Sequence, residues 1–509
     1  MNDVLMDLLQ ELSLSNDWLV LLPEILMALL AIIILGVDLF KTNASRELAL
    51  RWTVALALGG QILVLFALSF FGGQFYKEGI PLFGGLIEQS ELSQYMRTFF
   101  LFSSLGISFF AGYFFKSKRL PQAEYLHIVL LATAGFMLLV QSSHFIAFFV
   151  NLELVTVAFY VLVAFQRTSV FSLEAGLKYL ALGALSSAFL LFGIVLLYGI
   201  SGNPEMTGFT QDGFNFTALQ AFIVSNSDSV IVRLGALFVL AGIGFKIGLV
   251  PFQIWVPDVY QGAPAPTTAF LAIASKAAGI FVFMQLLHGP FLALSEWLLP
   301  LLSVLCAATI LYGSIAASGQ NNIKRLIGLS GISHAGYLLL GVLAGLTVPQ
   351  AIGAVLFYLS VYMLGSFLVF AAMIFLNEAD DSQLELNTYR GLYAKSPLLA
   401  ASGIIGLGSL AGIPPLGGFI AKLLLFMAVY KAGLYGLLAV AVLGVVVSIF
   451  YYFAWIRSMV SIPDLEHTSS GGSESAIICL SRMQRAFLIG TIALVLIVGL
   501  YPSLLSHFI

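Results

Sequence analysis

Apolar stretches long enough to cross a lipid bilayer recur along nearly the whole sequence. A spanning helix needs about 20 mostly apolar residues, because no water inside the bilayer satisfies exposed backbone groups. On that criterion the sequence predicts about fourteen spans. They run approximately over 19–40, 52–72, 97–115, 125–142, 144–165, 173–199, 229–250, 264–288, 294–317, 325–346, 350–376, 397–429, 433–456 and 485–506. Only 9% of the residues are charged, against about 25% in soluble domains, so we expect an all-α polytopic membrane protein.

The sequence gives no support to several other function classes. A net charge of −3 does not favour a nucleic-acid partner. Cys306 and Cys479 lie far apart, with no CxxC pair or His/Cys cluster, so no iron–sulfur cluster or other metal site is expected. Nucleotide-binding glycine motifs are missing from any strand–helix context. The N-terminal MNDVLMDLLQELSLSNDW has no Lys or Arg and is not expected to be a cleavable signal peptide.

The basic residues are distributed unequally between the two sides of the predicted membrane. If the N-terminus is outside, the inside loops hold fourteen Lys and Arg residues, and the outside loops and span edges hold four. This follows the positive-inside rule. We therefore predict an even number of spans with both termini on the outer side, in a bacterial cytoplasmic membrane or, alternatively, an organelle membrane. Glu24 and Asp38, at opposite ends of the first span, are expected to be solvated.

Prolines interrupt the seventh and twelfth predicted spans. Pro251 lies in Gly244–Pro266, which reads GFKIGLVPFQIWVPDVYQGAPAP, and Pro414 and Pro415 lie in GIPPLGG. Proline has no N–H and clashes one turn back, so it ends a helix. The two breaks are five spans apart, and an odd offset inverts the topology. We expect three N-terminal helices in 1–124, inverted five-helix repeats in 125–288 (spans 4–8) and 294–456 (spans 9–13), and a loop with a last helix in 457–509.

Charged residues inside the predicted spans are the candidates for function. They are Glu153, Lys246, Lys276 and Lys422, and charges in such positions usually mark ion pathways. Glu153 either makes a packing hydrogen bond or pairs with a lysine on another span. A lysine in a membrane helix ordinarily extends its side chain to the lipid–water interface. This explanation fits Lys276 poorly, because apolar residues flank it on both sides. A carboxylate near a lysine stabilises the protonated amine, so opening such a pair would let the lysine release a proton.

Three further residues are also candidates, and for each of them the sequence allows both a structural and a functional interpretation. Glu174 and Lys178 are four residues apart, the spacing of a helical ion pair, and a structural pair is about as good an explanation as a functional one. His334 lies within the tenth span, where it either relays protons or packs as a neutral side chain. Asp258, after the break at Pro251, is expected to cap or orient the following loop.

Two segments closely resemble the antiporter-like membrane subunits of NADH:quinone oxidoreductase (respiratory complex I), of the N type. They are Gly244–Pro266, followed by AIASK, and Ser409–Lys422, which reads SLAGIPPLGGFIAK. The wider family includes the L and M subunits and the Mrp-type cation/proton antiporters. The PDVYQGAPAP segment and Lys422 favour the N type, since the M type carries a glutamate at the latter position. The L type is disfavoured because no long lateral helix follows the last span.

The resemblance implies a fold, an activity and roles for particular residues. It implies fourteen helices, two inverted five-helix repeats and a polar axis at mid-membrane depth. The axis positions match Glu153, Lys246, Lys276 and Lys422, with Glu174, Lys178 and His334 as relay or modulating residues. The implied activity is that of a translocase subunit, which couples electron transfer from NADH to quinone to proton pumping.

The resemblance also implies which cofactors and partners to expect. Flavin, iron–sulfur clusters and quinone are handled by other subunits, so this subunit binds no cofactor. The expected partners are an M-type neighbour, the small A, J and K subunits, and lipids. Two alternatives stay open at this point: a subunit of a Mrp-type sodium/proton antiporter, and a structural subunit that seals the complex without conducting.

Overall fold

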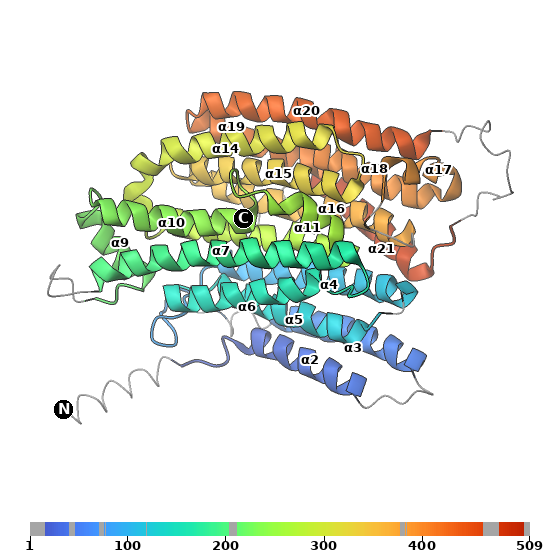
Figure 1. Ribbon diagram of the computed structural model, residues 1–509, viewed down its shortest axis with the longest axis horizontal. Helices are drawn as coiled ribbons and strands as arrows, with labels where there is room; N and C mark the ends of the chain where they lie inside the picture. The colour runs from blue at the N-terminus through green and yellow to red at the C-terminus, as the bar shows by residue number, and fades with distance from the viewer. Residues whose placement is uncertain are drawn as a thin grey trace. The chain divides into compact units, whose positions relative to one another are not determined.

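The computed structural model describes residues 16–39, 46–70, 76, 78–118, 120–202, 211–376, 382, 384–461 and 478–502. The N-terminal acidic segment up to residue 15, the C-terminal end, and most of the loop between residues 458 and 484 lie outside these ranges. The described chain is almost entirely helical (Figure 1). Its helices are α2 Leu22–Leu39, α3 Arg46–Phe70, α4 Glu91–Lys118, α5 Gln122–Leu139, α6 Phe145–Val163, α7 Val170–Ser201, α9 Phe216–Ser225, α10 Val230–Ile247, α11 Trp255–Gly262, α12 Ala265–Phe270, η3 Leu271–Ser275, α13 Lys276–His288, η4 Leu292–Leu294, α14 Ser295–Ser318, α15 Ile323–Gly345, α16 Gln350–Leu376, η6 Leu386–Tyr389, α17 Leu392–Lys395, α18 Pro397–Ala411, α19 Gly417–Lys431, α20 Tyr435–Val460 and α21 Arg482–Leu500.

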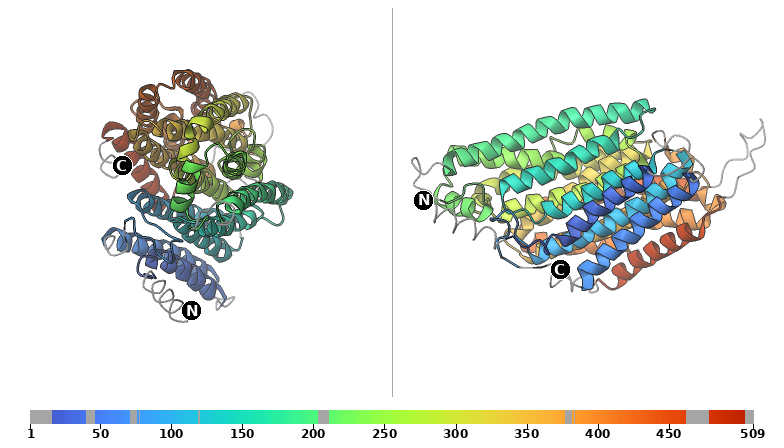
Figure 2. Two further views of the ribbon diagram at one scale, coloured as in Figure 1. Left: turned by 90° about the vertical axis from the view of Figure 1, so that its left-hand side faces the viewer. Right: turned by 90° about the horizontal axis from the view of Figure 1, so that it is seen from below.

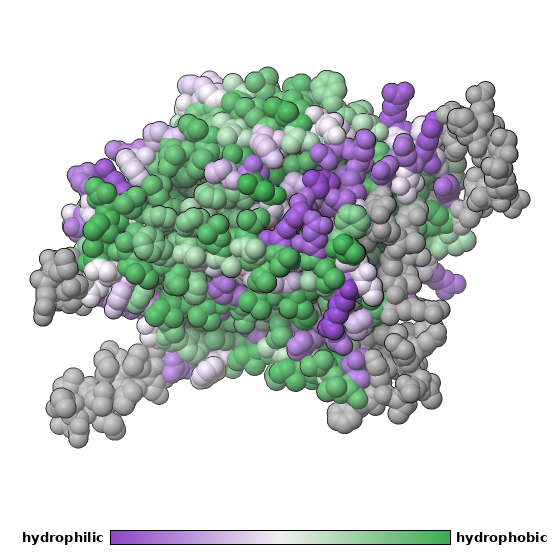
Figure 3. Space-filling view, viewed as in Figure 1, coloured by the Kyte–Doolittle hydropathy of each residue, from purple (hydrophilic) through white to green (hydrophobic). Residues whose placement is uncertain are grey.

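Helices of membrane-spanning length occur where the sequence predicts them. Within the described residues, 13 helices are long and apolar enough to cross a membrane. The remaining predicted span, 397–429, is formed by the two shorter helices α18 and α19. Hydrophobic side chains dominate the face shown in Figure 3, as expected for helices that contact lipid. The all-helical polytopic architecture is therefore confirmed.

Both interrupted helices end at a glycine that precedes the prolines. α10 ends at Ile247, and Gly248 has φ +80°, a left-handed conformation that favours glycine. The helix therefore stops three residues earlier than the predicted 250, before Pro251 is reached. α18 ends in the same way, with Gly412 at φ +85° ahead of the two prolines. The breaks at spans seven and twelve are thus built from glycine and proline together.

The chain forms two units, each compact in itself. Residues 1–162, 179–246 and 277–298 form the first unit, and residues 163–178, 247–276 and 299–509 form the second. In the first unit α5 packs against α2, α3 and α4, and these four helices lie side by side in Figures 1 and 2. In the second unit α16 packs against α15, α18, α19 and α21. Side chains of α15 and α16 are almost wholly buried, so these helices form its core.

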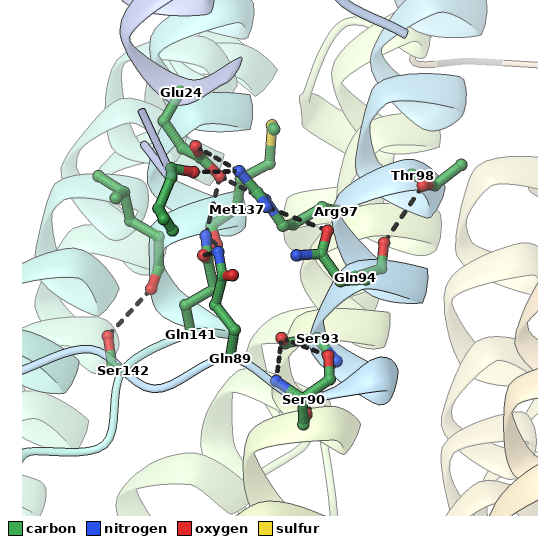
Figure 4. Close-up of polar contacts among 12 residues, drawn as sticks. Glu24, Gln89, Ser90, Ser93, Gln94, Arg97, Thr98, Met137, Gln141 and Ser142 are labelled. Atoms are coloured by element: carbon green, nitrogen blue, oxygen red, sulfur yellow. Dashed lines mark hydrogen bonds and ion pairs between the residues drawn. The ribbon is translucent and has the colours of Figure 1, made fainter. Parts of the chain in front are cut away.

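A buried ion pair joins three helices of the first unit (Figure 4). Arg97 on α4 donates from Nε to Glu24 Oε1 at 2.7 Å and from Nη2 to Glu24 Oε2 at 2.8 Å. Gln141, just after α5, donates to the same Glu24 Oε1 at 2.8 Å and accepts from Gln89 at 2.6 Å. The guanidinium also reaches the backbone oxygen of Val20 at 2.9 Å. The pair therefore fixes the start of α2 against α4 and α5.

The expectation that Glu24 is solvated was wrong. Its side chain is 3% exposed, and that of Arg97 is 0% exposed. A carboxylate near a span end is ordinarily close to water, but here a guanidinium and an amide replace the water. The partners come from α4 and from the turn after α5, and no local pattern in the sequence of α2 indicates them.

Candidate functional site

In the first unit, Lys246 lies buried in the last turn of α10 and faces α6. Its Nζ donates to Thr156 Oγ1 at 2.8 Å and lies 4.0 Å from Glu153 Oε1. Thr156 follows Glu153 by three residues on α6, so the two side chains lie on one helix face. On its other side, the same Glu153 Oε1 accepts from Ser187 Oγ on α7 at 2.6 Å. Lys246 therefore has a carboxylate at the outer limit of ion-pair distance and a hydroxyl closer by.

This geometry lets the Lys246–Glu153 pair tighten or open with little movement. Glu153 Oε1 accepts a hydrogen bond from Ser187 and lies 4.0 Å from the amine of Lys246, which is on another helix. A small shift of the carboxylate toward Lys246 would strengthen the charge interaction, and a shift toward Ser187 would weaken it. The sequence predicted Glu153 and Lys246 as candidates, and the structure brings their side chains to 4.0 Å. Nothing in the sequence singles out Thr156 or Ser187.

In the second unit, Lys276 directly follows a π-helical turn. α12, η3 and α13 form one continuous helix over 265–288, and the π-helix Leu271–Ser275 ends immediately before Lys276. Such turns insert an extra residue into a helix and are frequent at functional positions. Lys276 Nζ donates to Gly331 O at 2.7 Å and to Tyr362 Oη at 3.1 Å. It also lies 4.9 Å from the centroid of the Tyr362 ring.

Gly331 leaves the space that the Lys276 ammonium occupies. A Cβ atom at residue 331 would lie 2.7 Å from Lys276 Nζ, well inside van der Waals contact. We expect Gly331→Ala to displace the amine from its carbonyl acceptor at little cost in stability, because the amine ends a flexible side chain. Activity of the complete complex should fall several-fold through the loss of that hydrogen bond, which is worth about 1 kcal/mol. Turnover of the purified variant measures this. Gly490→Ala is the control, because a Cβ there meets nothing within 4 Å; equal activities of the two variants would contradict the expectation.

His334 on α15 has a tyrosine hydroxyl at each ring nitrogen. Nδ1 lies 2.7 Å from Tyr358 Oη on α16, and Nε2 lies 3.1 Å from Tyr452 Oη on α20. The ring centroid is also 4.9 Å from that of Tyr362, the residue that contacts Lys276. The histidine is buried, which also fits the interpretation that it packs as a neutral side chain. Its hydrogen bonds, however, go entirely to groups that can pass a proton.

Lys422 on α19 caps the end of α18. Its Nζ donates to Leu410 O at 3.0 Å and to Ala411 O at 2.9 Å. The two preceding carbonyls, of Gly408 and Ser409, accept from the backbone N–H groups of residues 413 and 412 at 3.0 Å each. A helix leaves its last four carbonyls without intrahelical donors. Lys422 therefore completes the hydrogen bonding of a helix end inside the predicted membrane region.

Glu174 and Lys178 form the predicted ion pair and extend it to two further residues. Lys178 Nζ lies 2.7 Å from Glu174 Oε1 and 2.6 Å from Asp258 Oδ2. Asp258 on α11 also accepts from Arg325 Nη1 on α15 at 2.7 Å. These four side chains are each about a third or more exposed, unlike the buried lysines. Asp258 thus holds α11 to α7 and α15, a wider role than orienting a loop.

No metal-binding cluster supports a metal site in the described part of the chain. Among those residues, no three or more His, Cys, Asp or Glu side chains are grouped so that they could hold a metal ion. Cys306 is buried and Cys479 is exposed, and both are free thiols.

Comparison with known proteins shows which family this chain belongs to. The family model described as "NADH:quinone oxidoreductase/Mrp antiporter, TM" matches residues 142–448. A subunit N 1 of NADH-quinone oxidoreductase from Opitutus terrae is 51% identical over 448 residues, covering 87% of this chain and 87% of the relative. The chain belongs to this family. A subunit N from Rhodospirillum rubrum is 34% identical, over 95% of this chain and 94% of the relative.

Solved structures agree with the antiporter-like assignment. A chain of respiratory complex I from Thermus thermophilus has a TM-score of 0.74 and 28% identity, covering 95% of this chain and 98% of its own length. A chain of the Mrp complex from Dietzia sp. has a TM-score of 0.76 at 22% identity, covering 96% of each chain, which shows a shared fold. The family match begins before Glu153 and ends after Lys422, so it contains every candidate charged residue. Glu24 and Arg97 lie outside it.

Proposed function

We propose that this chain acts as the N-type, proton-translocating membrane subunit of an NADH:quinone oxidoreductase. In that complex, electron transfer from NADH to quinone drives protons across the membrane. The observation that carries the proposal is the placement of Lys246 beside Glu153 in a buried site of an antiporter-like subunit. A buried lysine with an adjustable carboxylate partner is a proton-exchange site, because the carboxylate sets how tightly the amine holds its proton.

The other candidate residues extend this exchange into a path. Approach of Glu153 would hold the proton on Lys246, and separation would release it. Lys276 and His334 would relay the proton, and Lys422 would connect the path to the outer side or to the next subunit. Lys178 and Glu174, tied to Asp258, would modulate Lys246 or couple it to the quinone-bearing end. Flavin, iron–sulfur clusters and quinone would be held by other subunits, and this one would bind no cofactor.

The same proposal assigns a location and partners. We place the chain in the bacterial cytoplasmic membrane with both termini on the outer side, which the excess of inside basic residues supports. Its neighbours would be an M-type antiporter-like subunit, the small A, J and K subunits, and lipids. The likeness to a chain of respiratory complex I supports an assembled membrane arm.

We also infer that 125–288 and 294–456 are inverted repeats, flanked by 1–124 and 457–509. Each proposed repeat contains one helix that stops at a left-handed glycine, Gly248 or Gly412, followed by proline. In each, a buried lysine lies next to the break, Lys246 before it and Lys422 after it.

The alternatives draw less support from the comparisons. A Mrp-type antiporter subunit shares the fold, but the Dietzia chain is only 22% identical, whereas the subunit N from Opitutus terrae is 51% identical. A non-conducting structural subunit makes a distinct prediction: Lys246→Ala and Lys422→Ala would leave pumping intact.

The experiment that tests the proposal compares wild type with Lys246→Ala in the reconstituted complex, recording proton pumping and NADH:quinone turnover together. We expect both to fall. Lys431→Ala, at the exposed end of α19, is the matched control and should behave as wild type. Unchanged pumping in Lys246→Ala would favour the structural alternative, and loss of pumping with intact turnover would mean that this path can be uncoupled.

A further inference from the structure

His144 caps the start of α6, the helix that carries Glu153. Its backbone carbonyl accepts the first intrahelical hydrogen bond, from Phe148 N at 2.9 Å, and its Nδ1 accepts from Ile146 N at 3.1 Å. A side-chain acceptor at this position satisfies one of the N–H groups that the start of a helix leaves without intrahelical partners. Asparagine, aspartate, serine and threonine usually provide that acceptor. A histidine in their place adds a group that can change its charge.

The cap determines which nitrogen of the imidazole carries the proton. A backbone N–H can only donate, so Nδ1 is unprotonated and the neutral ring carries its proton on Nε2. Nε2 then donates to Asp212 Oδ2 at 2.9 Å, in the segment that precedes α9. The side chain of His144 is 6% exposed, whereas that of Asp212 is 55% exposed. The buried ring is therefore hydrogen-bonded to a carboxylate that is in contact with water.

A second proton on the ring is incompatible with the cap. It would bind to Nδ1, and the new N–H would then face the N–H of Ile146 with no acceptor between them. The positive ring would also lie at the start of α6, where the helix dipole already places positive charge. Asp212 acts in the opposite direction, because its carboxylate attracts the imidazolium. Protonation of His144 therefore keeps the contact with Asp212 and releases the start of α6.

The other charged and titratable groups near His144 lie on the elements that pack against the turn from 141 to 144. The turn bonds to the segment before α4, to α2, to α13 and to the segment before α9. On these elements and on α4 the groups are Glu24, Glu88, Glu91, Arg97, Asp212 and His288. Within the described ranges, Asp212 is the one that forms an ion pair with His144. Its carboxylate is therefore the charge that most directly affects the imidazole.

A change at the cap reaches the candidate site along α6. Glu153 follows His144 by nine residues, about 13 Å along a helix. Glu153 Oε1 lies 4.0 Å from Lys246 Nζ, at the outer limit of an ion pair. A slight displacement of α6 therefore moves the two groups into or out of ion-pair distance.

We propose that His144 is a positioning residue for Glu153 and that acid on the outer side of the membrane releases its hold on α6. Histidine is the side chain that ordinarily changes charge between about pH 5 and 8. The start of α6 lies on the outer side in the predicted topology, where the proposed function delivers protons. Acidification there would open the cap, loosen α6 and slow turnover. This inference rests on the proposed function, because it describes how the delivered protons limit the same site.

The test compares wild type with His144→Asn in the reconstituted complex. Asparagine places Oδ1 where Nδ1 lies, so it keeps the cap but does not become protonated. With the inside at about pH 7.5 and no membrane potential, NADH:quinone turnover is measured at outer pH values of about 7.5 and 5.5. Both proteins then work against the same pH gradient. We expect equal turnover at the higher pH and a roughly fivefold greater loss in wild type at the lower pH, the factor for a cap of ordinary strength.

Two further variants control this comparison. His288→Asn is the matched control, since His288 ends α13 on the same predicted side and should show the wild-type response. In Asp212→Asn the amide oxygen still accepts from Nε2 but no longer carries the charge that attracts the imidazolium. The loss of turnover should then begin at a lower outer pH than in wild type. If the His144→Asn complex does not assemble, Asp212→Asn at the exposed partner carries the test, and an unchanged pH response would overturn the inference.

Hydrogen exchange provides a readout that does not depend on pumping. The amides of residues 145–149 should exchange about fivefold faster in wild type than in His144→Asn at pH 5.5, and equally at pH 7.5. Equal exchange at both pH values, or the same pH response of turnover in the two proteins, would overturn the inference while Lys246→Ala still abolishes pumping. Wild-type pumping in Lys246→Ala would instead overturn the proposed function, and with it the link to turnover, whereas the exchange result would still decide whether acid opens the cap.

Discussion

Arg97→Met will lower the stability of the protein by about 3–5 kcal/mol, because it leaves the buried Glu24 carboxylate without its cation. Glu24 is 3% exposed and accepts two hydrogen bonds from the guanidinium. Methionine fills a similar volume but donates nothing, so the carboxylate keeps only the Gln141 amide. Thermal unfolding of the purified protein, together with the amount that assembles into the complex, measures the loss.

Two further variants separate the charge effect from a packing effect. Replacing both Glu24 and Arg97 by methionine should restore most of the stability, since an apolar pair in place of a buried ion pair is often neutral or better. Arg233→Met is the exposed comparison: Arg233 pairs with Asp228, which is 98% exposed, and such pairs are worth about 0–1 kcal/mol. A loss in Arg97→Met no larger than in Arg233→Met would contradict the assignment of Arg97 as a buried charge partner.

The helices and the buried lysines were accessible from sequence because both follow from the energetics of a bilayer. A run of apolar residues must form a helix there. A lysine such as Lys276 or Lys422 in such a run is costly to bury, so it usually marks a functional position. The interrupted helices were also predictable, since Pro251 cannot continue a helix. The predicted end of α10 was three residues too late because Gly248 adopts a left-handed conformation. A glycine within an apolar run does not by itself indicate that conformation.

The partners of these residues were not accessible, because they depend on packing between distant helices. Thr156 lies 90 residues from Lys246, and Tyr452 lies 118 residues from His334. Hydroxyl side chains are common in apolar helices, so nothing marks these two beforehand. The prediction that Glu24 is solvated was wrong for the same reason, since its partner Arg97 is 73 residues away. Charge in an apolar run indicates that a partner is needed but does not identify it.

Lys422→Arg will separate the helix-capping role that the structure shows for Lys422 from the proton-exchange role that we propose for it. The amine bonds two carbonyls at the end of α18, Leu410 O and Ala411 O. A neutral amine still has two N–H donors, so Lys422 can release a proton without losing either hydrogen bond. Arginine keeps the positive charge and has ample donors for the cap, but it does not deprotonate in proteins. We therefore expect Lys422→Arg to assemble normally and to lose pumping and turnover by about a hundredfold, the scale of a lost proton-transfer group.

Lys422→Met supplies the contrast, since it removes both the proton site and the cap. Two buried carbonyls then lack donors, and each costs about 1–3 kcal/mol, so this variant should lose stability as well as activity. The measurements are thermal unfolding and reconstituted proton pumping of both variants beside wild type. If Lys422→Arg pumps as well as wild type while Lys422→Met is unstable, Lys422 is a helix cap alone and the path through α19 is excluded. Stable but inactive Lys422→Arg instead assigns proton exchange to Lys422, because hydrogen bonding to α18 would then be intact and only the release of a proton would be blocked.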